Sequence, residues 1–275
     1  MNSFLLIIRP FNCLFISLAV FMGAIINNYI YDYPIVFIAM ISAMLIGAGG
    51  YVINDFYDIP IDAINKPNRI LPSGKIPPKT AYLYGVFLFV LGFSVSYFTK
   101  NLWGIIIAIT NSVLLYLYAK KGKRVLIVNN LIVGYTTASA FLYGAIINQN
   151  VKNVIPLVLF TFLYTVTREI VKDAEDLEGD MNYGADTLAT KFGRRTAVYT
   201  SLFVALLLAV LIYGCQVYGF LSLGLGRLLL ISYTVPLIAV YLPLFREISK
   251  EKLYRASQII KGHMFALLFV MVLYR

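Results

Sequence analysis

Two groups of aspartates in the chain share one spacing. The pattern D-x-x-D-x-x-x-D occurs at Asp55, Asp58 and Asp62, and again at Asp173, Asp176 and Asp180. Offsets of three and seven residues lie on one face of a helix, so each triplet is predicted to present its carboxylates together. Only 13 residues are acidic, and three of them lie in 54–62 and seven in 169–186. This concentration of negative charge indicates two matched sites for divalent cations.

The carboxylates of each triplet need something to offset their mutual repulsion. Two unit charges about 6 Å apart repel by roughly 3 kcal/mol at an effective dielectric constant near 20. Wide solvation, raised pKa values or a bound cation would each relieve it. The available ligands are the carboxylate oxygens and the Asn54 amide, and His263 is the only histidine. This ligand chemistry favours Mg²⁺ over zinc.

Basic residues flank both triplets. They are Lys66, Arg69, Lys120, Lys121, Arg124, Arg168 and Lys172. Carboxylates beside cations suit a Mg²⁺-bound diphosphate, in which the metal bridges carboxylate to phosphate and the cations take the remaining charge. Basic loops also occur at the cytoplasmic edge of any membrane protein, so each cation alone indicates little about a ligand.

The elements that must position these residues are predicted to be transmembrane helices. A mean hydropathy of +0.80 and a hydrophobic content of 60% lie outside the range of soluble domains. A span needs about 20 apolar residues. The sequence predicts nine spans, at 10–28, 35–54, 79–99, 102–119, 125–147, 154–172, 195–217, 227–245 and 256–274. The predicted fold class is therefore an all-α membrane protein, with residues 1–275 forming a single domain.

The connections between these segments alternate in charge. All but four of the 23 basic residues fall on one side, and the exceptions are Lys100, Lys152, Arg227 and Arg275. This asymmetry predicts that the N-terminus and both triplets are cytoplasmic and that the C-terminus lies outside. It also accounts for the net charge of +10 without a nucleic-acid partner. Because the triplets end the second and sixth segments, we expect two parallel four-helix halves plus one additional helix, with the active region between the halves.

Pro60 interrupts the first triplet. A proline cannot continue an unperturbed helix, so the second segment is predicted to end or kink near Ile59, and Asp62 to begin a second short segment. Upstream, small residues are predicted to let helices approach closely, namely Ala43, Gly47, Gly49 and Gly50.

With these residues in view, the chain resembles the UbiA superfamily of intramembrane prenyltransferases over its whole length. The first signature of that family, N-D-x-x-D-x-x-x-D, is similar to the run from Asn54 to Asp62, and a P-S-G turn follows Arg69. The second signature resembles the Asp173 triplet with its following G-x-x-T-L. Two shorter motifs match as Y-x-x-x-K at Tyr116 and Lys120, and as R-P-x-N at Arg9 and Asn12. One departure is Arg69-Ile70, where many members have Arg-Pro.

The resemblance implies a mechanism and roles for individual residues. One Mg²⁺ would be bound by Asn54, Asp58 and Asp62 beside Asp55, and a second by Asp176 and Asp180 with Asp173 nearby. The metals would grip an allylic diphosphate, whose departure would be assisted by Lys120, Arg69 and Lys172. The C1–O bond would ionise and leave an allylic cation, held dry inside the bundle and attacked by an acceptor. Catalytic roles are thereby expected for Lys120, Tyr116, Arg69 and Asp173, and substrate-binding roles for Arg9, Asn12, Lys66, Lys121, Arg124, Arg168 and Lys172.

Two features of the sequence bear on the acceptor. The compact chain and the run R-E-I-V-K-D-A-E-D-L-E-G-D are most similar to archaeal family members that move a geranylgeranyl group from its diphosphate to the glycerol 2-hydroxyl of geranylgeranylglyceryl phosphate. An anionic lipid-phosphate acceptor would use additional basic residues such as Lys121, Lys123 or Arg124. The alternatives are an aromatic acceptor on the same fold, for quinone, haem or chlorophyll synthesis, and a divalent-cation transporter. A transporter predicts acids at mid-membrane on facing spans, whereas these triplets fall at segment ends.

Overall fold

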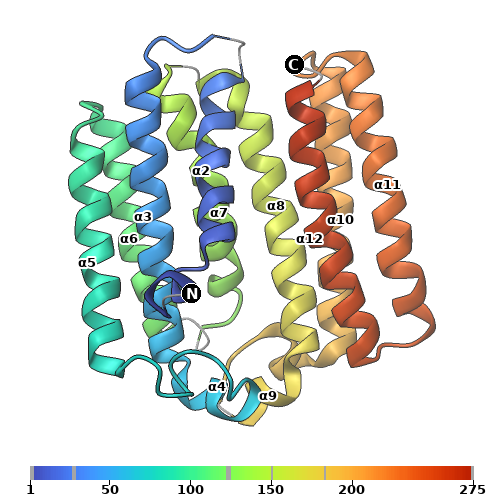
Figure 1. Cartoon of the computed structure of the whole chain (residues 1–275). Helices are drawn as coiled ribbons and strands as arrows, with labels where there is room; N and C mark the ends of the chain where they lie inside the picture. Colours follow the sequence, from blue (N-terminus) through green and yellow to red (C-terminus); the bar gives the residue numbers. More distant parts are fainter. Residues whose placement is uncertain (1–2, 27–28, 122–124, 150, 183, 274–275) are drawn as a thin grey trace. The chain divides into compact units, whose positions relative to one another are not determined.

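The computed structural model describes residues 3–26, 29–121, 125–149, 151–182 and 184–273, and every regular element within those ranges is a helix (Figure 1). In chain order the helices are α1 (Ser3–Ile7), α2 (Pro10–Ile25), α3 (Tyr33–Tyr57), α4 (Ile59–Asn65), α5 (Pro78–Tyr97), α6 (Leu102–Lys121), α7 (Val128–Ile147), α8 (Val151–Glu175), α9 (Leu177–Asn182), α10 (Leu188–Val217), α11 (Leu223–Arg246) and α12 (Lys250–Leu273). The predicted all-α class is confirmed.

A helix lies at each of the nine predicted segments, but fewer of them are long and apolar enough to cross a membrane. Among the described residues seven helices meet that standard: α3, α5, α6, α7, α8, α10 and α11. The segment predicted at 10–28 contains α2, which has only 16 residues. The segment predicted at 256–274 belongs to α12 (Lys250–Leu273), which is not among these seven helices. The count of nine spans stays a prediction.

Packing divides the chain into two compact units. Unit 1 comprises Met1–Gly122 with Ser139–Val154, and unit 2 comprises Lys123–Ala138 with Ile155–Arg275. The chain passes between the units within α7 and again within α8.

Within unit 1, helix α3 contacts α2, α5 and α6. Small residues bring α3 and α5 together, because a Cβ atom added at Gly49 would lie 2.9 Å from the carbonyl oxygen of Gly85. Further along the same contact, the Ser42 hydroxyl donates a 2.8 Å hydrogen bond to the carbonyl oxygen of Gly92. Close approach of two backbones at small residues is typical of helices in membranes.

A second close crossing in unit 1 joins α2 to the C-terminal part of α7. A Cβ atom at Gly23 would overlap the carbonyl oxygen of Phe141, and one at Gly144 would overlap that of Val20. These glycines allow the two backbones to touch, and no other residue type fits there without a shift of the helices.

The turn that follows α2 is tied to the end of α7 by one amide. The Nδ2 atom of Asn148 donates hydrogen bonds to the carbonyl oxygens of Ala24 (2.8 Å) and Tyr29 (2.6 Å). Its Oδ1 atom accepts from the backbone N–H of Tyr31 at 2.9 Å. The side chain is 2% exposed. One buried residue therefore satisfies three backbone groups, one in the last turn of α2 and two in the connection that follows.

In unit 2, α10 contacts α9 and α11, and α11 contacts α12. Helix α10 begins with a capping box, in which Thr187 and Thr190 each accept a hydrogen bond from the other's backbone N–H. Gly193 then adopts φ 84°, a value that only glycine reaches without strain, and this kinks α10 near its start. The phenol of Tyr233 donates to the Ala205 carbonyl oxygen at 3.0 Å and fastens α11 to α10.

Candidate active site

The first aspartate triplet sits where one helix gives way to another. Asp55 lies in the last turn of α3, Asp58 is the residue between α3 and α4, and Asp62 lies in α4. The predicted break near Ile59 is confirmed, and the break places the triplet on two helices instead of one continuous face. Backbone hydrogen bonds from Asp58 to Asn54 (2.9 Å) and from Asp62 to Asp58 (2.8 Å) keep the helical repeat across it.

The second triplet has the same local structure. Asp173 lies in the last turn of α8, Asp176 stands between α8 and α9, and Asp180 lies in α9. The backbone N–H of Asp176 bonds to Lys172 at 2.9 Å and that of Asp180 bonds to Asp176 at 3.0 Å. The third aspartate is buried in each triplet, Asp62 at 5% and Asp180 at 6% exposure. The shared sequence spacing therefore corresponds to a shared backbone arrangement.

Two arginines hold the first triplet. Arg9 at the N-terminus of α2 donates from Nη2 to Oδ1 of Asp55 at 2.5 Å, and its guanidinium lies 5.0 Å from the centre of the Tyr51 ring. Arg69 donates from Nη1 to Oδ2 of Asp62 at 2.5 Å and lies 3.6 Å from Asp55. Arg9 and Arg69, for which the family resemblance implies substrate-binding and catalytic roles, thus contact the carboxylates of this triplet directly.

The central aspartate of the first triplet pairs with a neutral group. The Asn54 amide donates from Nδ2 to Oδ2 of Asp58 at 2.8 Å. The Asn54 Oδ1 atom and the other Asp58 oxygen are hard oxygen ligands of the kind that Mg²⁺ prefers. Within the described ranges no three His, Cys, Asp or Glu side chains converge closely enough to form a metal site unaided. The donor set fits a Mg²⁺ ion that keeps waters and takes phosphate oxygens as its other ligands.

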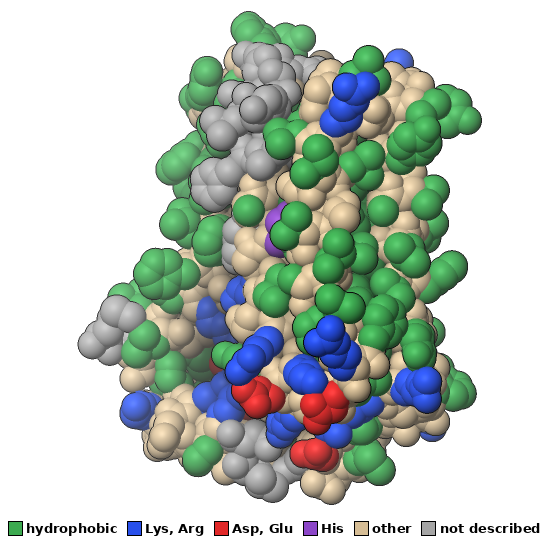
Figure 2. Space-filling model, turned by 90° about the vertical axis from the view of Figure 1, so that its right-hand side faces the viewer, with side chains coloured by type: hydrophobic (Ala, Val, Ile, Leu, Met, Phe, Trp, Pro, Cys, Tyr) green, Lys and Arg blue, Asp and Glu red, His purple; other side chains and the backbone are tan. Residues whose placement is uncertain are grey.

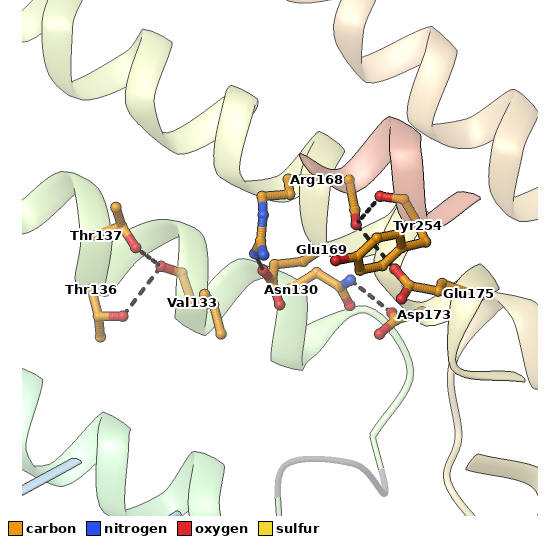
Figure 3. A network of polar contacts seen from close by, with 10 residues as sticks. Asn130, Val133, Thr136, Thr137, Arg168, Glu169, Asp173, Glu175 and Tyr254 are labelled. Atoms are coloured by element: carbon orange, nitrogen blue, oxygen red, sulfur yellow. Dashed lines mark hydrogen bonds and ion pairs between the residues drawn. The ribbon is translucent and has the colours of Figure 1, made fainter. Parts of the chain in front are cut away.

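An asparagine orients the first aspartate of the second triplet. Asn130 in the first turn of α7 donates from Nδ2 to Oδ2 of Asp173 at 2.8 Å (Figure 3). Asn130 is 4% exposed. Sequence reasoning missed this residue, because an asparagine near a helix start is unremarkable until its distant partner is known.

The same close-up shows two further contacts around the second triplet. Arg168 donates from Nη1 to Oε1 of Glu169 at 2.5 Å, next to the Asn130–Asp173 pair (Figure 3). Glu175 accepts a 3.0 Å hydrogen bond from the Ser257 hydroxyl, which brings α12 to the end of α8. Arg168, predicted as a ligand of the substrate, thus lies beside the triplet, and Glu169 partly neutralises it.

The tyrosine and lysine of the Y-x-x-x-K motif lie in the last two turns of α6. The Lys120 ammonium is exposed and lies 6.0 Å from the centre of the Tyr116 ring. The Tyr116 hydroxyl is 3.2 Å from that of Tyr82 and 3.4 Å from that of Tyr57. Unit 1 thereby gathers three phenols beside a lysine, with Tyr57 immediately preceding Asp58 in the chain.

The remaining predicted ligands are placed less closely. Asn12 contacts Tyr51 in unit 1. Lys66 follows α4, and Lys172 is exposed in the last turn of α8. Arg124 and the side chain of Lys121 lie outside the residues that the structure describes, as does Lys123.

His263, the only histidine, takes no part in either triplet. Its Nδ1 atom lies 2.7 Å from the Tyr164 hydroxyl inside unit 2. The ring also packs edge-on against Tyr164, with the ring centres 5.7 Å apart.

Figure 2 shows most cationic and acidic side chains gathered toward one end of the face that it presents, with hydrophobic side chains scattered above them and cationic side chains also at the opposite end. Ion pairs connect helices of unit 2, with Arg194 on α10 2.9 Å from Glu178 on α9 and Lys250 on α12 3.7 Å from the same carboxylate. The hydrogen bond from Arg194, assisted by the charge of Lys250, lowers the pKa of Glu178 from its ordinary value. These pairs fasten α9, and with it Asp180, to the neighbouring helices.

Residues 14–269 match the sequence pattern of the UbiA prenyltransferase family, which covers most of the chain. The chain belongs to the UbiA prenyltransferase family. Among the similar relatives is the digeranylgeranylglyceryl phosphate synthase of Methanocaldococcus jannaschii, 35% identical over 266 residues that cover 95% of this chain and 92% of that one. The synthase of the same name from Methanospirillum hungatei is 35% identical over 278 residues, covering 98% and 97%.

Solved structures of the UbiA family resemble this chain as well. One of a digeranylgeranylglyceryl phosphate synthase superposes with a TM-score of 0.82 at 34% identity, covering 99% of this chain and 97% of the other. A UbiA homologue from Archaeoglobus fulgidus, bound to DMAPP and Mg²⁺, gives a TM-score of 0.76 at 17% identity, covering 98% and 99%. The second likeness concerns the fold alone.

Proposed function

We propose that this UbiA-family chain transfers a geranylgeranyl group from geranylgeranyl diphosphate to the glycerol 2-hydroxyl of geranylgeranylglyceryl phosphate. The products are digeranylgeranylglyceryl phosphate and diphosphate. The observation that carries this proposal is the 35% identity to digeranylgeranylglyceryl phosphate synthases over at least 95% of this chain. The reaction is one of archaeal ether-lipid synthesis, and its hydrophobic substrates suit an enzyme built of membrane-spanning helices.

The reaction breaks one C–O bond and makes another. The C1–O bond of the allylic diphosphate breaks with its electron pair on the diphosphate, and C1 then bonds to the acceptor oxygen, which loses its proton. Mg²⁺, when bound, neutralises charge on the departing diphosphate. Asn54, Asp58 and Asp62 are proposed to hold one ion and the Asp173 triplet the other. Support comes from the equivalent helix breaks of the two triplets and from their all-oxygen donor sets.

Fixed positive charges are proposed to stabilise the diphosphate as it leaves. Lys120, Arg69 and Lys172 carry this role, because preorganised cations at a site of developing negative charge are usually the largest catalytic contribution. Asp55 is proposed to orient Arg9 and Arg69, since its carboxylate already contacts both. The rings of Tyr57, Tyr82 and Tyr116 offer aromatic faces near Lys120 that can stabilise an allylic cation and exclude water.

We further propose that the chain forms one domain of nine spans, arranged as two parallel four-helix halves with an additional helix, and that both triplets are cytoplasmic. The repeated helix break at the two triplets supports the duplication. A similar repeat occurs earlier, since the helices α2 and α7 each begin after a left-handed residue, Arg9 at φ 54° and Ile127 at φ 64°.

Turnover of defined acceptors tests the proposed function. Purified protein in detergent with Mg²⁺ and labelled geranylgeranyl diphosphate should convert geranylgeranylglyceryl phosphate to the doubly prenylated lipid, detected by mass spectrometry. Parallel reactions contain 4-hydroxybenzoate or dihydroxynaphthoate in its place. Prenylation of an aromatic acceptor but not of the glyceryl phosphate lipid would replace the proposal by the aromatic alternative. Cation flux into proteoliposomes without any prenyl diphosphate would favour a transporter.

A further inference from the structure

The hydrogen bond between Asn130 and Asp173 joins two helices at a buried position. Its length is 2.8 Å, and it occupies Oδ2 of the carboxylate, so Oδ1 is the oxygen left for a cation (Figure 3). The donor is a neutral amide and adds no positive charge to the cluster. Asp173 therefore gains a fixed orientation from a partner that carries no charge of its own.

The start of α7 is built to place Asn130 there. Ile127 has φ 64°, in the left-handed region that a β-branched residue rarely adopts. The backbone N–H of Leu131 bonds to the Ile127 carbonyl oxygen at 3.1 Å, so the helix starts abruptly and Asn130 falls in its first turn. An unfavourable backbone conformation just before a buried polar side chain suggests a constraint beyond packing.

The spacing of α7 and α8 is set one turn further along. A Cβ atom at Gly134 would lie 2.8 Å from Cγ2 of Val166 and 3.1 Å from Cδ2 of Phe162, so the two helices are in close contact there. Asn130 precedes Gly134 by four residues and Asp173 follows Val166 by seven, which puts both on the contacting faces. The short side chains of Asn130 and Asp173 can meet only because this approach is close.

In unit 1 the first aspartate of the triplet also accepts a hydrogen bond from a residue at the start of a helix, but the donor differs. Arg9 has φ 54° and begins α2, and it donates to Asp55, the first aspartate of its triplet. In both units, then, the first aspartate accepts a hydrogen bond from a residue at the start of a helix that opens in a left-handed conformation. In unit 1 that donor is a cation and in unit 2 it is an amide.

We infer that Asn130 is a positioning residue of the second metal site, holding the Asp173 carboxylate so that its free oxygen meets the divalent cation. The inference rests on the proposed function for the identity of the site. Asn130 itself touches neither metal nor substrate. Partners that orient a ligand from behind typically change metal affinity 10- to 100-fold when they are removed.

Three substitutions distinguish this role from a purely structural one, in which the hydrogen bond only holds α7 against α8. Asn130→Leu keeps the size and removes the donor, whereas Asn130→Asp keeps the shape, adds negative charge and removes the donor. Thr137→Val is the matched control, because among the described residues the Thr137 hydroxyl donates within α7, to the Val133 carbonyl oxygen at 2.8 Å (Figure 3). Each is made in an Asp58→Ala background, so that Mn²⁺ binding followed by electron paramagnetic resonance reports on the second triplet.

The donor role predicts Mn²⁺ binding about 10- to 100-fold weaker in both Asn130 variants than in the Asp58→Ala parent, and unchanged binding in the Thr137→Val control. In protein with Asp58 intact, the Mg²⁺ concentration for half-maximal turnover should rise in parallel. Thermal unfolding in detergent verifies that each variant is folded. If Asn130→Leu does not fold, the test is made with Asn130→Asp alone.

Two results would overturn the inference. One is Mn²⁺ binding at parental affinity in Asn130→Leu, which would mean that Asn130 serves only as a structural contact between α7 and α8. The other is tighter binding in Asn130→Asp, which would mean that the charge of the cluster matters and the donor does not. Mn²⁺ binding is measured without substrate, so the two proposals can fail separately. If wild-type protein prenylates neither class of acceptor, the proposed function is contradicted and this inference is not. If wild-type turnover is normal but Mn²⁺ affinity does not depend on Asn130, only this inference is contradicted.

Discussion

The three aspartates of each triplet occupy different surroundings. The third is buried in both, at 5% for Asp62 and 6% for Asp180, and Asp62 bonds to Arg69. The central ones, Asp58 and Asp176, lie at the helix breaks, and Asp176 is exposed. We therefore expect the central aspartates to meet an incoming diphosphate most readily, alongside the cation ligands proposed at Asp62 and Asp173.

Replacing a central aspartate should abolish turnover without unfolding the protein. For Asp58→Ala and Asp176→Ala we expect losses of at least about 10²–10³-fold in kcat, the scale of removing one preorganised electrostatic contact. Removal of one like charge relieves repulsion, so stability without metal should be equal or higher. Turnover and thermal unfolding in detergent measure both. Near-normal turnover in either variant would count against the metal assignment.

Turnover and stability should depend on both the charge and the forked shape of the Arg69 guanidinium. Arg69→Ala leaves Asp62 buried without its cation, so we expect both lower kcat and a lower unfolding temperature. Arg69→Lys restores a point charge but not the forked geometry, and it should recover stability more than turnover. Lys75→Ala, an exposed residue of the same loop, is the control. Equal kcat in Arg69→Ala and Lys75→Ala would exclude a role for Arg69 in the reaction.

The sequence made the candidate residues visible where the signal is local. Carboxylate spacing marked both triplets, the basic residues beside them included Arg69, and the family motif marked Arg9, and the structure brings both arginines into contact with the first triplet. Asn130 could not be found this way. Its partner is 43 positions away, and the contact depends on how closely α7 approaches α8.

At the scale of elements, the helix break at each triplet is the feature that places the carboxylates. Pro60 made the first break predictable. The second has no proline, and neither the break at Asp176 nor the short helix α9 followed from the sequence pattern. Helix ends were also underestimated, since the apolar segment predicted at 154–172 is α8, Val151–Glu175. Hydropathy detects the part of a helix in lipid, and the helix continues beyond it through polar residues.

The glycine crossing between α2 and α7 should be intolerant of any side chain. Gly144→Ala forces a Cβ atom against the Val20 carbonyl oxygen, so we expect a loss of about 1–3 kcal/mol or more in unfolding free energy. Gly214→Ala in α10 meets nothing within 4 Å and should be neutral or slightly stabilising. Thermal unfolding in one detergent compares them. Similar unfolding temperatures for the two variants would contradict the close crossing.

At the scale of the whole molecule, the distribution of charge predicts an orientation. All but four of the 23 basic residues fall on the predicted cytoplasmic side. A single cysteine replacing Lys250 should then react with a membrane-impermeant maleimide only from the cytoplasmic face, whereas one replacing Lys100 should react only from outside. Both tests are made in a variant without Cys13 and Cys215. The reverse labelling pattern would invert the topology and move both triplets to the outer face.

The amide of Asn148 has a consequence for how activity losses are interpreted. Three backbone groups depend on this one side chain for a hydrogen bond. Asn148 follows the C-terminal end of α7, whereas Asn130 lies in the first turn of the same helix. A screen of random mutants scored by lipid product would rank Asn148 beside the aspartates, although it has no chemistry to perform. Weighing product against the amount of protein recovered from the membrane would tell the two kinds of loss apart.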